Sequence, residues 1–377
     1  MQEPDDEQHV DDVLQADTDE DSALDLGEDQ ISTASLTSTI RHFEIENGHT
    51  YHALNAGKYI LPNDEVALRF EDCRCTFADP SLISKKKTDW VRLTINYERT
   101  RRRLITTLAT DIQNQHFLAT FESRAHFALG ADTAQRVLDV GTGTGIWAIQ
   151  YGTELQLSRI ARMVADDLIP ADEHPAAQVI GVDLSPIQPT LVPPNCSFEI
   201  DDVEREWTWS FHFDYIFSRM MVGSFADWPS FIGRAYENLN PGGWLELQDC
   251  IFPLATDDGS FHEGQPMYEW SSLLLEASEK LGRSLGDATR HREHMVAAGF
   301  VNVTVKHFKW PSNHWPKDPR HKVVGLWTLA NIGEGLEGLS MALLSRGHGW
   351  SREQVLAYLT GVRRDLQDRR IHAYWPM

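Results

Sequence analysis

One stretch of nine residues constrains the fold of this chain more than any other. Residues 137–145 read Val-Leu-Asp-Val-Gly-Thr-Gly-Thr-Gly, and the run Ile-Trp-Ala-Ile-Gln-Tyr follows. The branched apolar residues predict a buried parallel strand, and the following run predicts the start of a helix. The glycines between them allow a sharp turn and close approach of the backbone to a ligand. A plain structural turn is the alternative, because a single glycine fingerprint is weak evidence.

Further apolar segments continue this pattern. Strands are predicted at Gln178–Asp183, Phe198–Asp202, Phe213–Ser218 and Trp244–Gln248. Before the last of them, apolar residues at 228, 231, 232, 235, 236 and 239 recur with the period of a helix that packs on a sheet. Asn-Pro-Gly-Gly at 240–243 ends that helix. The alternation of strands and helices predicts an α/β fold with a doubly wound, Rossmann-like parallel sheet.

The C-terminal part is predicted to add mainly helices to this sheet. One helix is expected at Asp287–Ala298, closed by Gly299, and an alternating pattern predicts a strand at Phe300–Phe308. Ser351 and Gln354 have the spacing of a capping box at the start of another helix.

The acidity of the chain is concentrated at its N-terminus. Residues 1–40 contain thirteen Asp or Glu and no Lys or Arg, out of a formal net charge of −22. This composition predicts a disordered acidic tail at 1–39, for which a solubilising role is favoured over a specific interaction motif. Residues 40–130 are expected to form an arm or lid, and residues 131–377 the main domain. Direct binding of nucleic acid is not expected, because it normally needs a basic surface.

The cysteines and the hydropathy pattern narrow the class of protein further. The four cysteines have neither the spacing of a zinc site nor that of a disulfide framework, so no metal site is predicted. No apolar run approaches eighteen residues, and the acidic N-terminus is unlike a signal peptide or a mitochondrial presequence. We therefore expect a cytoplasmic or nuclear protein that does not associate with membranes.

Two carboxylates end predicted strands beside the glycine turn. Ligands of doubly wound sheets bind outside the carboxyl ends of the strands. Asp183 is therefore placed to accept hydrogen bonds from the hydroxyls of a ribose, and a helix N-cap is a compatible alternative. Asp202 can accept from an adenine amine, with a solvated loop carboxylate as the alternative. Together with the turn, the two carboxylates predict a ligand that contains adenosine.

The spacing of the glycines separates two classes of adenosine cofactor. A dinucleotide site has the pattern Gly-x-Gly-x-x-Gly, with a helix N-terminus facing the pyrophosphate. Here the third glycine, Gly145, comes one residue early, and Ile146 occupies the sixth position. This spacing favours S-adenosyl-L-methionine and disfavours a dinucleotide oxidoreductase.

With these features the chain resembles the class I S-adenosylmethionine-dependent methyltransferases, and more narrowly the fungal LaeA-like group, which is linked to secondary metabolism. The segments that carry the resemblance are Tyr51–Ala53, Gly57–Glu65, Val137–Trp147, Val179–Pro189, Val192–Asp202 and Asn240–Asp249. The resemblance runs from about residue 47 to the C-terminus, with gaps. It implies a methyltransferase sheet, and a further strand beyond Met377.

The resemblance also implies a set of cofactor-binding residues. They are Asp139, Gly141, Thr142, Gly143, Gly145, Asp183, Leu184, Asp202, Val203 and Arg219. Asp183 would hold the ribose, Asp202 and Val203 would bracket the adenine, and the loop Ser218–Met220 would face the sulfonium. No catalytic residue is implied, because alignment and desolvation can supply much of the rate of an in-line displacement at an activated carbon.

Two segments depart from the family pattern. Gly145 and Asp183 are 38 residues apart, whereas the fingerprint expects an acid about 20 residues on. Removing residues 152–171 would restore the spacing, and residues 70–104 form a second departure. Each segment is either intron sequence retained in the gene model, which we favour, or a genuine surface insertion. Sequencing the transcript distinguishes the two.

The predicted function is the transfer of a methyl group from S-adenosylmethionine to an acceptor, either a small molecule of secondary metabolism or a protein side chain. The alternative is a regulatory subunit that binds the cofactor and acts through protein partners.

Overall fold

The computed structural model describes residues 7–9, 14–15, 44–46, 49–51, 108–153 and 177–377. The predicted acidic tail, most of the predicted arm and the two segments that depart from the family pattern lie wholly or largely outside these ranges. The predictions made for those parts of the chain stay predictions.

Five parallel strands form the central sheet. They are β4 (Arg136–Val140), β5 (Gln178–Asp183), β6 (Cys196–Ile200), β7 (Phe213–Arg219) and β8 (Leu239–Gln248). Their order across the sheet is β6-β5-β4-β7-β8, and every neighbouring pair is parallel. The chain builds outward from β4 to one edge and then returns to the other side of β4, which confirms the doubly wound sheet. In such a sheet the ligand crevice lies outside the carboxyl ends of the strands where the order reverses, here β4 and β7.

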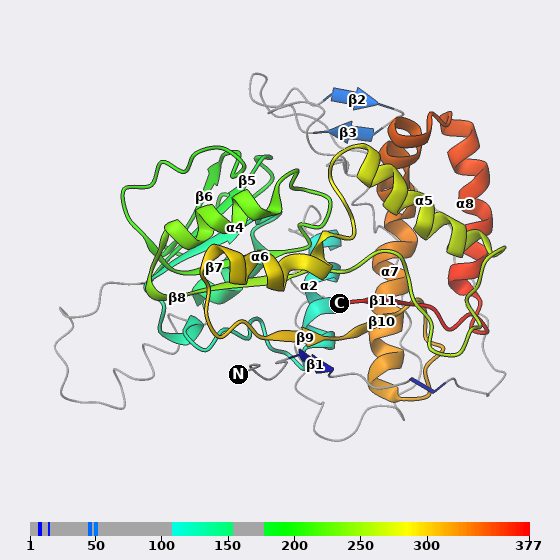
Figure 1. The fold of residues 1–377 in the computed structure, drawn as a ribbon, viewed down its shortest axis with the longest axis horizontal. Coiled ribbons are helices and arrows are strands. Elements are labelled where there is room, and N and C mark those ends of the chain that lie inside the picture. The colour runs from blue at the N-terminus through cyan, green and yellow to red at the C-terminus, as the bar shows by residue number, and fades with distance from the viewer. Residues whose placement is uncertain (1–6, 10–13, 16–43, 47–48, 52–107, 154–176) are drawn as a thin grey trace.

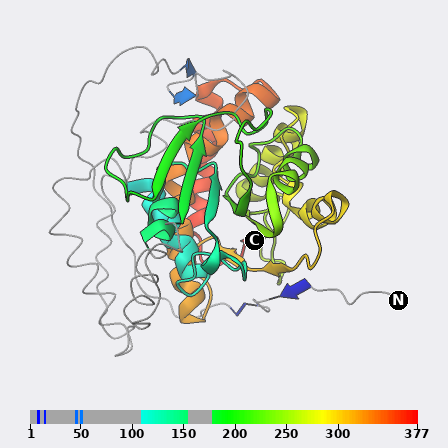
Figure 2. The same ribbon diagram turned by 90° about the vertical axis from the view of Figure 1, so that its left-hand side faces the viewer.

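Helices cover both faces of this sheet (Figures 1 and 2). One face packs on α4 (Trp228–Glu237) and α6 (His291–Ala298), which lie side by side. The other face packs on the helix described at 146–153, through Trp147 and Tyr151. Successive side chains of a strand point to opposite faces, so burial of both faces explains the nearly continuous apolar character of β4 and β7.

The C-terminal half adds a second apolar core beside the sheet. Its main helices are α5 (Pro266–Lys280), α7 (Pro319–Ala342) and α8 (Arg352–Gln367). A helix from much earlier in the chain, α2 (Leu108–Thr120), packs against α7. The antiparallel pair β10 (Lys309–Pro311) and β11 (Tyr374–Pro376) brings the last residues into this core. The remaining described elements are β1 (Glu7–His9), β2 (Glu44–Glu46), β3 (His49–Tyr51), η4 (Ala131–Thr133), η5 (Asp287–Arg290), β9 (Val305–His307) and the π-helix η6 (Leu343–Gly347).

Several local predictions are confirmed. The segment predicted as one helix at Asp287–Ala298 forms η5 followed by α6, and Gly299 ends it with a φ of 109°. Ser351 and Gln354 form the predicted capping box of α8. A glycine tolerates the left-handed backbone that closes a helix, and this explains why the chain turns at residue 299.

The strand predicted at Phe300–Phe308 is wrong for most of its length. Only Val305–His307 is in a strand, as β9, which pairs in parallel with β1. Asn302 has a φ of 57°, a left-handed conformation that interrupts an extended segment. The alternation of apolar and polar residues therefore did not identify a continuous strand here.

Two strand boundaries also differ from the prediction. The third strand begins at Cys196 and ends at Ile200, so Asp202 lies two residues beyond it. The fifth strand begins at Leu239 rather than Trp244, so Asn-Pro-Gly-Gly lies within β8. The pairing of β7 with β8 shifts register near residues 213–215, and such an irregularity lets glycine and proline remain in an edge strand.

Within the described part of the chain, no helix combines the length and apolar character needed to cross a bilayer.

Candidate functional site

The glycine turn after β4 has the backbone geometry that requires glycine. Gly141, Gly143 and Gly145 have φ values of 69°, 57° and 80°, which other residues rarely adopt. The backbone N–H groups of Gly141 and Thr142 donate to the carbonyl of Val182 at 2.9 and 3.0 Å. The turn is thereby held against the end of β5.

Close packing adds a second requirement for glycine at two of these positions. A Cβ atom on Gly141 would lie 2.2 Å from the sulfur of Met221, and one on Gly145 would lie 2.1 Å from the ring of Phe198. The two contacts come from different parts of the sheet, because Met221 follows the end of β7 and Phe198 lies in the middle of β6. The glycines therefore bring three strands together as well as exposing backbone at the edge of the sheet.

Asp139 is the first carboxylate of the site and belongs to β4. Its side chain is buried, and it accepts a hydrogen bond of 2.6 Å from the hydroxyl of Thr142. Burial raises the pKa of Asp139 to about 7, although the Thr142 hydroxyl and the charge of Arg219 oppose the shift. The charge of this carboxylate therefore changes near neutral pH.

Asp183 is the second carboxylate and connects the end of β5 to the glycine turn. It accepts hydrogen bonds of 2.9 Å from the backbone N–H groups of Gly143 and Ser185. Burial raises the pKa of Asp183 to about 6, against the opposing effect of these N–H groups. The structure therefore brings together Asp183 and the glycine turn, which the sequence places 40 residues apart. Leu184 follows Asp183 directly and is half-buried.

Gln188 is a contact of the glycine turn that the sequence analysis missed. Its side-chain amide donates to the backbone carbonyls of Gly143 at 2.7 Å and Ser185 at 3.0 Å. The available signal in the sequence was the Pro-rich run that contains Gln188. A segment without regular structure leaves backbone groups that nearby side chains must satisfy.

Asp202 lies in the turn that follows β6, and its side chain is buried. One carboxylate oxygen accepts from the backbone N–H of Glu204 at 3.1 Å, and the other lies 3.4 Å from Arg205. Its neighbour Val203 packs in an apolar cluster that also contains Met221. The turns after β6 and β7 are therefore in one packed unit with the glycine turn.

Arg219 is the last residue of β7, and its guanidinium connects three parts of the chain. It donates to the side chains of Gln248 in β8 and Asn114 in α2, both at 2.9 Å, and to the carbonyl of Ala125 at 3.2 Å. Burial lowers the pKa of Arg219 to about 10, and the charges of Asp139 and Glu246 limit that shift. Asn114 was missed in the sequence, because nothing in its neighbourhood signals a contact 105 residues away.

Glu246 in β8 is a further polar anchor that the sequence analysis missed. Its carboxylate accepts from the backbone N–H groups of Phe127 and Ala128 at 2.8 to 3.0 Å, and from the hydroxyl of Tyr215 at 2.9 Å. Burial and the neighbouring Glu246 charge raise the pKa of Tyr215 well above its usual value, so it stays a donor. Glu246 thereby fixes the segment that enters the sheet from α2.

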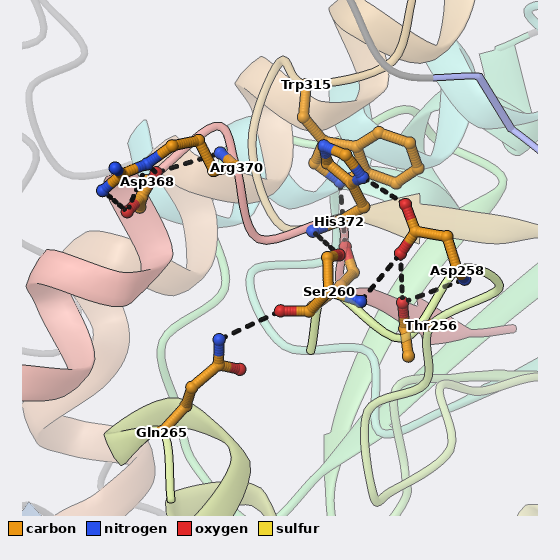
Figure 3. Close-up of polar contacts among 9 residues, drawn as sticks. Thr256, Asp258, Ser260, Gln265, Trp315, Asp368, Arg370 and His372 are labelled. Atoms are coloured by element: carbon orange, nitrogen blue, oxygen red, sulfur yellow. Dashed lines mark hydrogen bonds and ion pairs between the residues drawn. The ribbon is translucent and has the colours of Figure 1, made fainter. Parts of the chain in front are cut away.

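A second polar cluster brings a serine, a histidine and an aspartate together (Figure 3). The imidazole of His372 contacts Asp258 at 2.5 Å, and the ring packs against Trp315. The hydroxyl of Ser260 accepts from the backbone N–H of His372 at 2.8 Å. A nucleophilic serine needs its hydroxyl bonded to the imidazole, so this arrangement joins two segments rather than forming a catalytic triad.

Among the residues that the structure describes, no three His, Cys, Asp or Glu side chains are grouped as metal ligands. Cys196 and Cys250 are free and buried.

Comparison with known proteins adds to this geometry. The model of a family described as "Methyltransferase domain" matches residues 97–305. The chain is 34% identical to Methyltransferase pytC of Aspergillus terreus, over 91% of this chain and 88% of that protein. It is 30% identical to Secondary metabolism regulator laeA of Aspergillus fumigatus, over 87% of this chain and 73% of that protein. It is 29% identical to Protein-methionine methyltransferase laeA of Emericella nidulans, over 90% of this chain and 76% of that protein.

These relatives span most of the chain, and they include both methyltransferases and regulators of secondary metabolism, as the resemblance implied. The doubly wound order of the five strands and the glycine turn after the first of them agree with that assignment. The chain belongs to the methyltransferase-domain family.

Proposed function

We propose that this protein binds S-adenosyl-L-methionine at the carboxyl edge of the sheet and transfers its methyl group to an acceptor. The observation that carries the proposal is the hydrogen bonding of the Asp183 carboxylate. This carboxylate is held by the N–H groups of Gly143 and Ser185 at the point where β4 and β5 end. A carboxylate has more acceptor sites than these two donors use, so it can also accept from two ribose hydroxyls.

The other residues of the site fit the remaining parts of this cofactor. Asp202 and Val203 would bracket the adenine, and the glycine turn would hold the methionine portion. Asp139 supplies negative charge near a sulfonium cation when it is ionised. Arg219 would form the wall of this part of the site, because its guanidinium is already engaged by protein acceptors and its charge is offset by Asp139 and Glu246.

The methyl transfer requires alignment of the cofactor and the acceptor rather than a protein base. The bound cofactor supplies a methyl group that is already activated for displacement. The glycine turn and Asp183 would fix the direction of the methyl group, and the apolar packing of Val203 and Met221 would exclude water. Orientation and desolvation of this kind can account for a large part of the rate of such a transfer.

We propose a small molecule of secondary metabolism as the acceptor. The similarity to Methyltransferase pytC over most of both chains supports an enzyme of this kind. The relatives described as secondary metabolism regulators favour a second candidate, a cofactor-binding regulatory subunit that acts through protein partners. The relative described as a protein-methionine methyltransferase makes a protein side chain the alternative acceptor.

Calorimetric titration tests the cofactor first. S-adenosylmethionine is expected to bind and NAD to give no heat, whereas heat with NAD alone would overturn the assignment. The acceptor is then tested with S-adenosylmethionine labelled in its methyl group and extracts separated into small molecules and proteins. Label in small molecules supports the first candidate, label in protein supports the alternative acceptor, and binding without transfer supports the regulatory subunit.

A further inference from the structure

A buried cation from the C-terminal half joins the two turns that flank the candidate site. The guanidinium of Arg283 donates to the carboxylate of Glu204 at 2.9 Å and to the backbone carbonyl of Ser224. The side chains of Arg283 and Glu204 are only 7% and 14% exposed. Glu204 belongs to the turn after β6, and Ser224 belongs to the turn after β7. We call Arg283, Glu204 and Ser224 the Arg283 junction.

The position of Arg283 is set by the way α5 ends. Gly282 has a φ of 72° and donates to the carbonyl of Glu279 at 3.0 Å, and the N–H of Arg283 donates to the carbonyl of Ser278 at 2.9 Å. These two bonds form a Schellman motif, which stops a helix at a defined residue. The backbone of Arg283 is therefore fixed by local sequence, independently of the turns that its side chain contacts.

The Arg283 junction is hydrogen-bonded, through Glu204, to Asp202, the residue proposed to recognise adenine. The backbone N–H of Glu204 donates to the Asp202 carboxylate at 3.1 Å. The Glu204 side chain also accepts from the backbone N–H of Ala226 at 2.8 Å. A shift of Glu204 would thus change the direction of the Asp202 carboxylate.

The Arg283 junction is also connected to the glycine turn, through Ser224 and Met221. The N–H of Ser224 donates to the carbonyl of Met221 at 2.9 Å. The sulfur of Met221 lies against Gly141, where it leaves no space for a Cβ atom. The one guanidinium therefore contacts both turns, and both turns contact the edge of the sheet where the cofactor is proposed to bind.

We propose that Arg283 is a positioning residue for cofactor recognition, which sets the Asp202 carboxylate to accept from the 6-amino group of adenine. This inference rests on the proposed function. An ion pair buried in this way is weak evidence for a purely stabilising role, because the cost of removing two charges from water offsets much of their attraction. Its geometry, with one cation shared between two turns of the site, favours a role in recognition.

The test compares two ligands by calorimetry, S-adenosylhomocysteine and its analogue with hydrogen in place of the 6-amino group. The intact protein is expected to prefer S-adenosylhomocysteine by about tenfold, because the analogue lacks the amino group that would donate to the Asp202 carboxylate in addition to the Glu204 N–H. In Arg283→Gln this preference is expected to fall to about threefold or less. Loss of overall stability alone would weaken both ligands equally and leave the preference unchanged.

Two further variants keep the test decisive. Glu204→Gln keeps the shape of the Arg283 junction without the negative charge, and it is also expected to reduce the preference for S-adenosylhomocysteine. It therefore tests the proposal even if Arg283→Gln does not fold. Lys309→Gln is the matched control, since it breaks a partly buried pair of 2.7 Å between β10 and Asp257 rather than a contact with Glu204 or Ser224. That control is expected to keep the full preference.

The outcomes separate this inference from the proposed function. If the intact protein binds neither ligand, the proposed function fails. If it binds and discriminates but Arg283→Gln and Glu204→Gln retain the preference, only the role of Arg283 is refuted.

Discussion

Asp139 and Asp183 lie at the same edge of the sheet, but their carboxylates accept from different kinds of donor. Asp139 is 3% exposed and accepts from the hydroxyl of Thr142, whereas Asp183 accepts from two backbone N–H groups. Burial raises the pKa of both carboxyls, to about 7 and about 6. The negative charge that would face a sulfonium cation is therefore complete only above neutral pH.

The raised pKa of Asp139 predicts a pH-dependent cost to folding. In the unfolded chain this carboxyl has a pKa near 3.8, so the folded protein binds the proton more tightly. Stability is then lost as the pH rises from about 4 to about 7. Asp139→Asn is expected to raise the melting temperature relative to the original protein more at pH 8 than at pH 5, as measured by thermal unfolding. An equal change at the two pH values would contradict the assignment.

Asp183 carries the proposal for the ribose, and its replacement tests that placement. Asp183→Ala is expected to weaken binding of S-adenosylmethionine at least about tenfold, because the ribose hydroxyls would lose an acceptor at a cost of roughly 1 to 3 kcal/mol. Calorimetric titration measures this change. Asp214→Ala is a suitable control, since Asp214 also accepts from two backbone N–H groups but lies near the start of β7. Unchanged affinity in Asp183→Ala would refute the placement.

At the scale of the element, agreement with the sequence was best where a short pattern specifies local geometry. The predicted bounds of the strand at Gln178–Asp183 are those of β5, because a buried parallel strand needs an unbroken apolar run. The strand predicted at Phe300–Phe308 failed, because alternation of residue types does not reveal a left-handed residue such as Asn302. Patterns describe which face is buried, and they do not show whether a partner strand is available.

The capping box of α8 supplies a prediction at this scale. Ser351 accepts from the N–H of Gln354 at 3.3 Å, and the Gln354 side chain accepts from the N–H of Ser351 at 2.8 Å. Ser351→Ala leaves one donor of the first turn without its partner and is expected to cost about 1 kcal/mol of unfolding free energy. Urea denaturation measures this value. Ser272→Ala within α5, an exposed mid-helix site, should change stability far less.

At the scale of the whole molecule, the cluster in Figure 3 joins distant parts of the C-terminal half. Asp258 lies after β8 and His372 lies just before β11, yet the two side chains are in contact. β11 in turn brings the buried side chains of Trp375 and Met377 into the core shared by α5, α7 and α8. The contact therefore helps to hold the last strand in place.

This contact has a predictable pH dependence. Burial alone would raise the pKa of Asp258, but hydrogen bonds from His372, Ser260 and Thr256 outweigh it and hold the pKa well below its usual value. A lowered pKa means that the stabilisation is present above about pH 4 and is lost as the pH falls toward the folded value. Asp258→Asn is therefore expected to lower the melting temperature at pH 6 and to have a smaller effect at pH 3. Equal loss at the two pH values would argue against an ionised Asp258 carboxylate in this contact.

The sequence by itself determined the doubly wound sheet, the glycine turn and the methyltransferase family. The sheet and the turn rest on short patterns, namely apolar runs and glycine spacing, in which each residue acts on its immediate neighbours. The family rests on the resemblance of longer segments. The sequence also predicted that Asp183 lies beside the turn, because parallel strands place their carboxyl ends together.

The tertiary structure alone decided which side chains support that edge. Asn114 and Arg219 are 105 residues apart, and Glu204 and Arg283 are 79 apart. Contacts at such separations follow from which elements the fold brings together, and the pairing of two distant polar side chains leaves no period or spacing in the sequence. Buried polar groups must find partners wherever the fold brings them, and for this reason only the folded chain shows how the site is held.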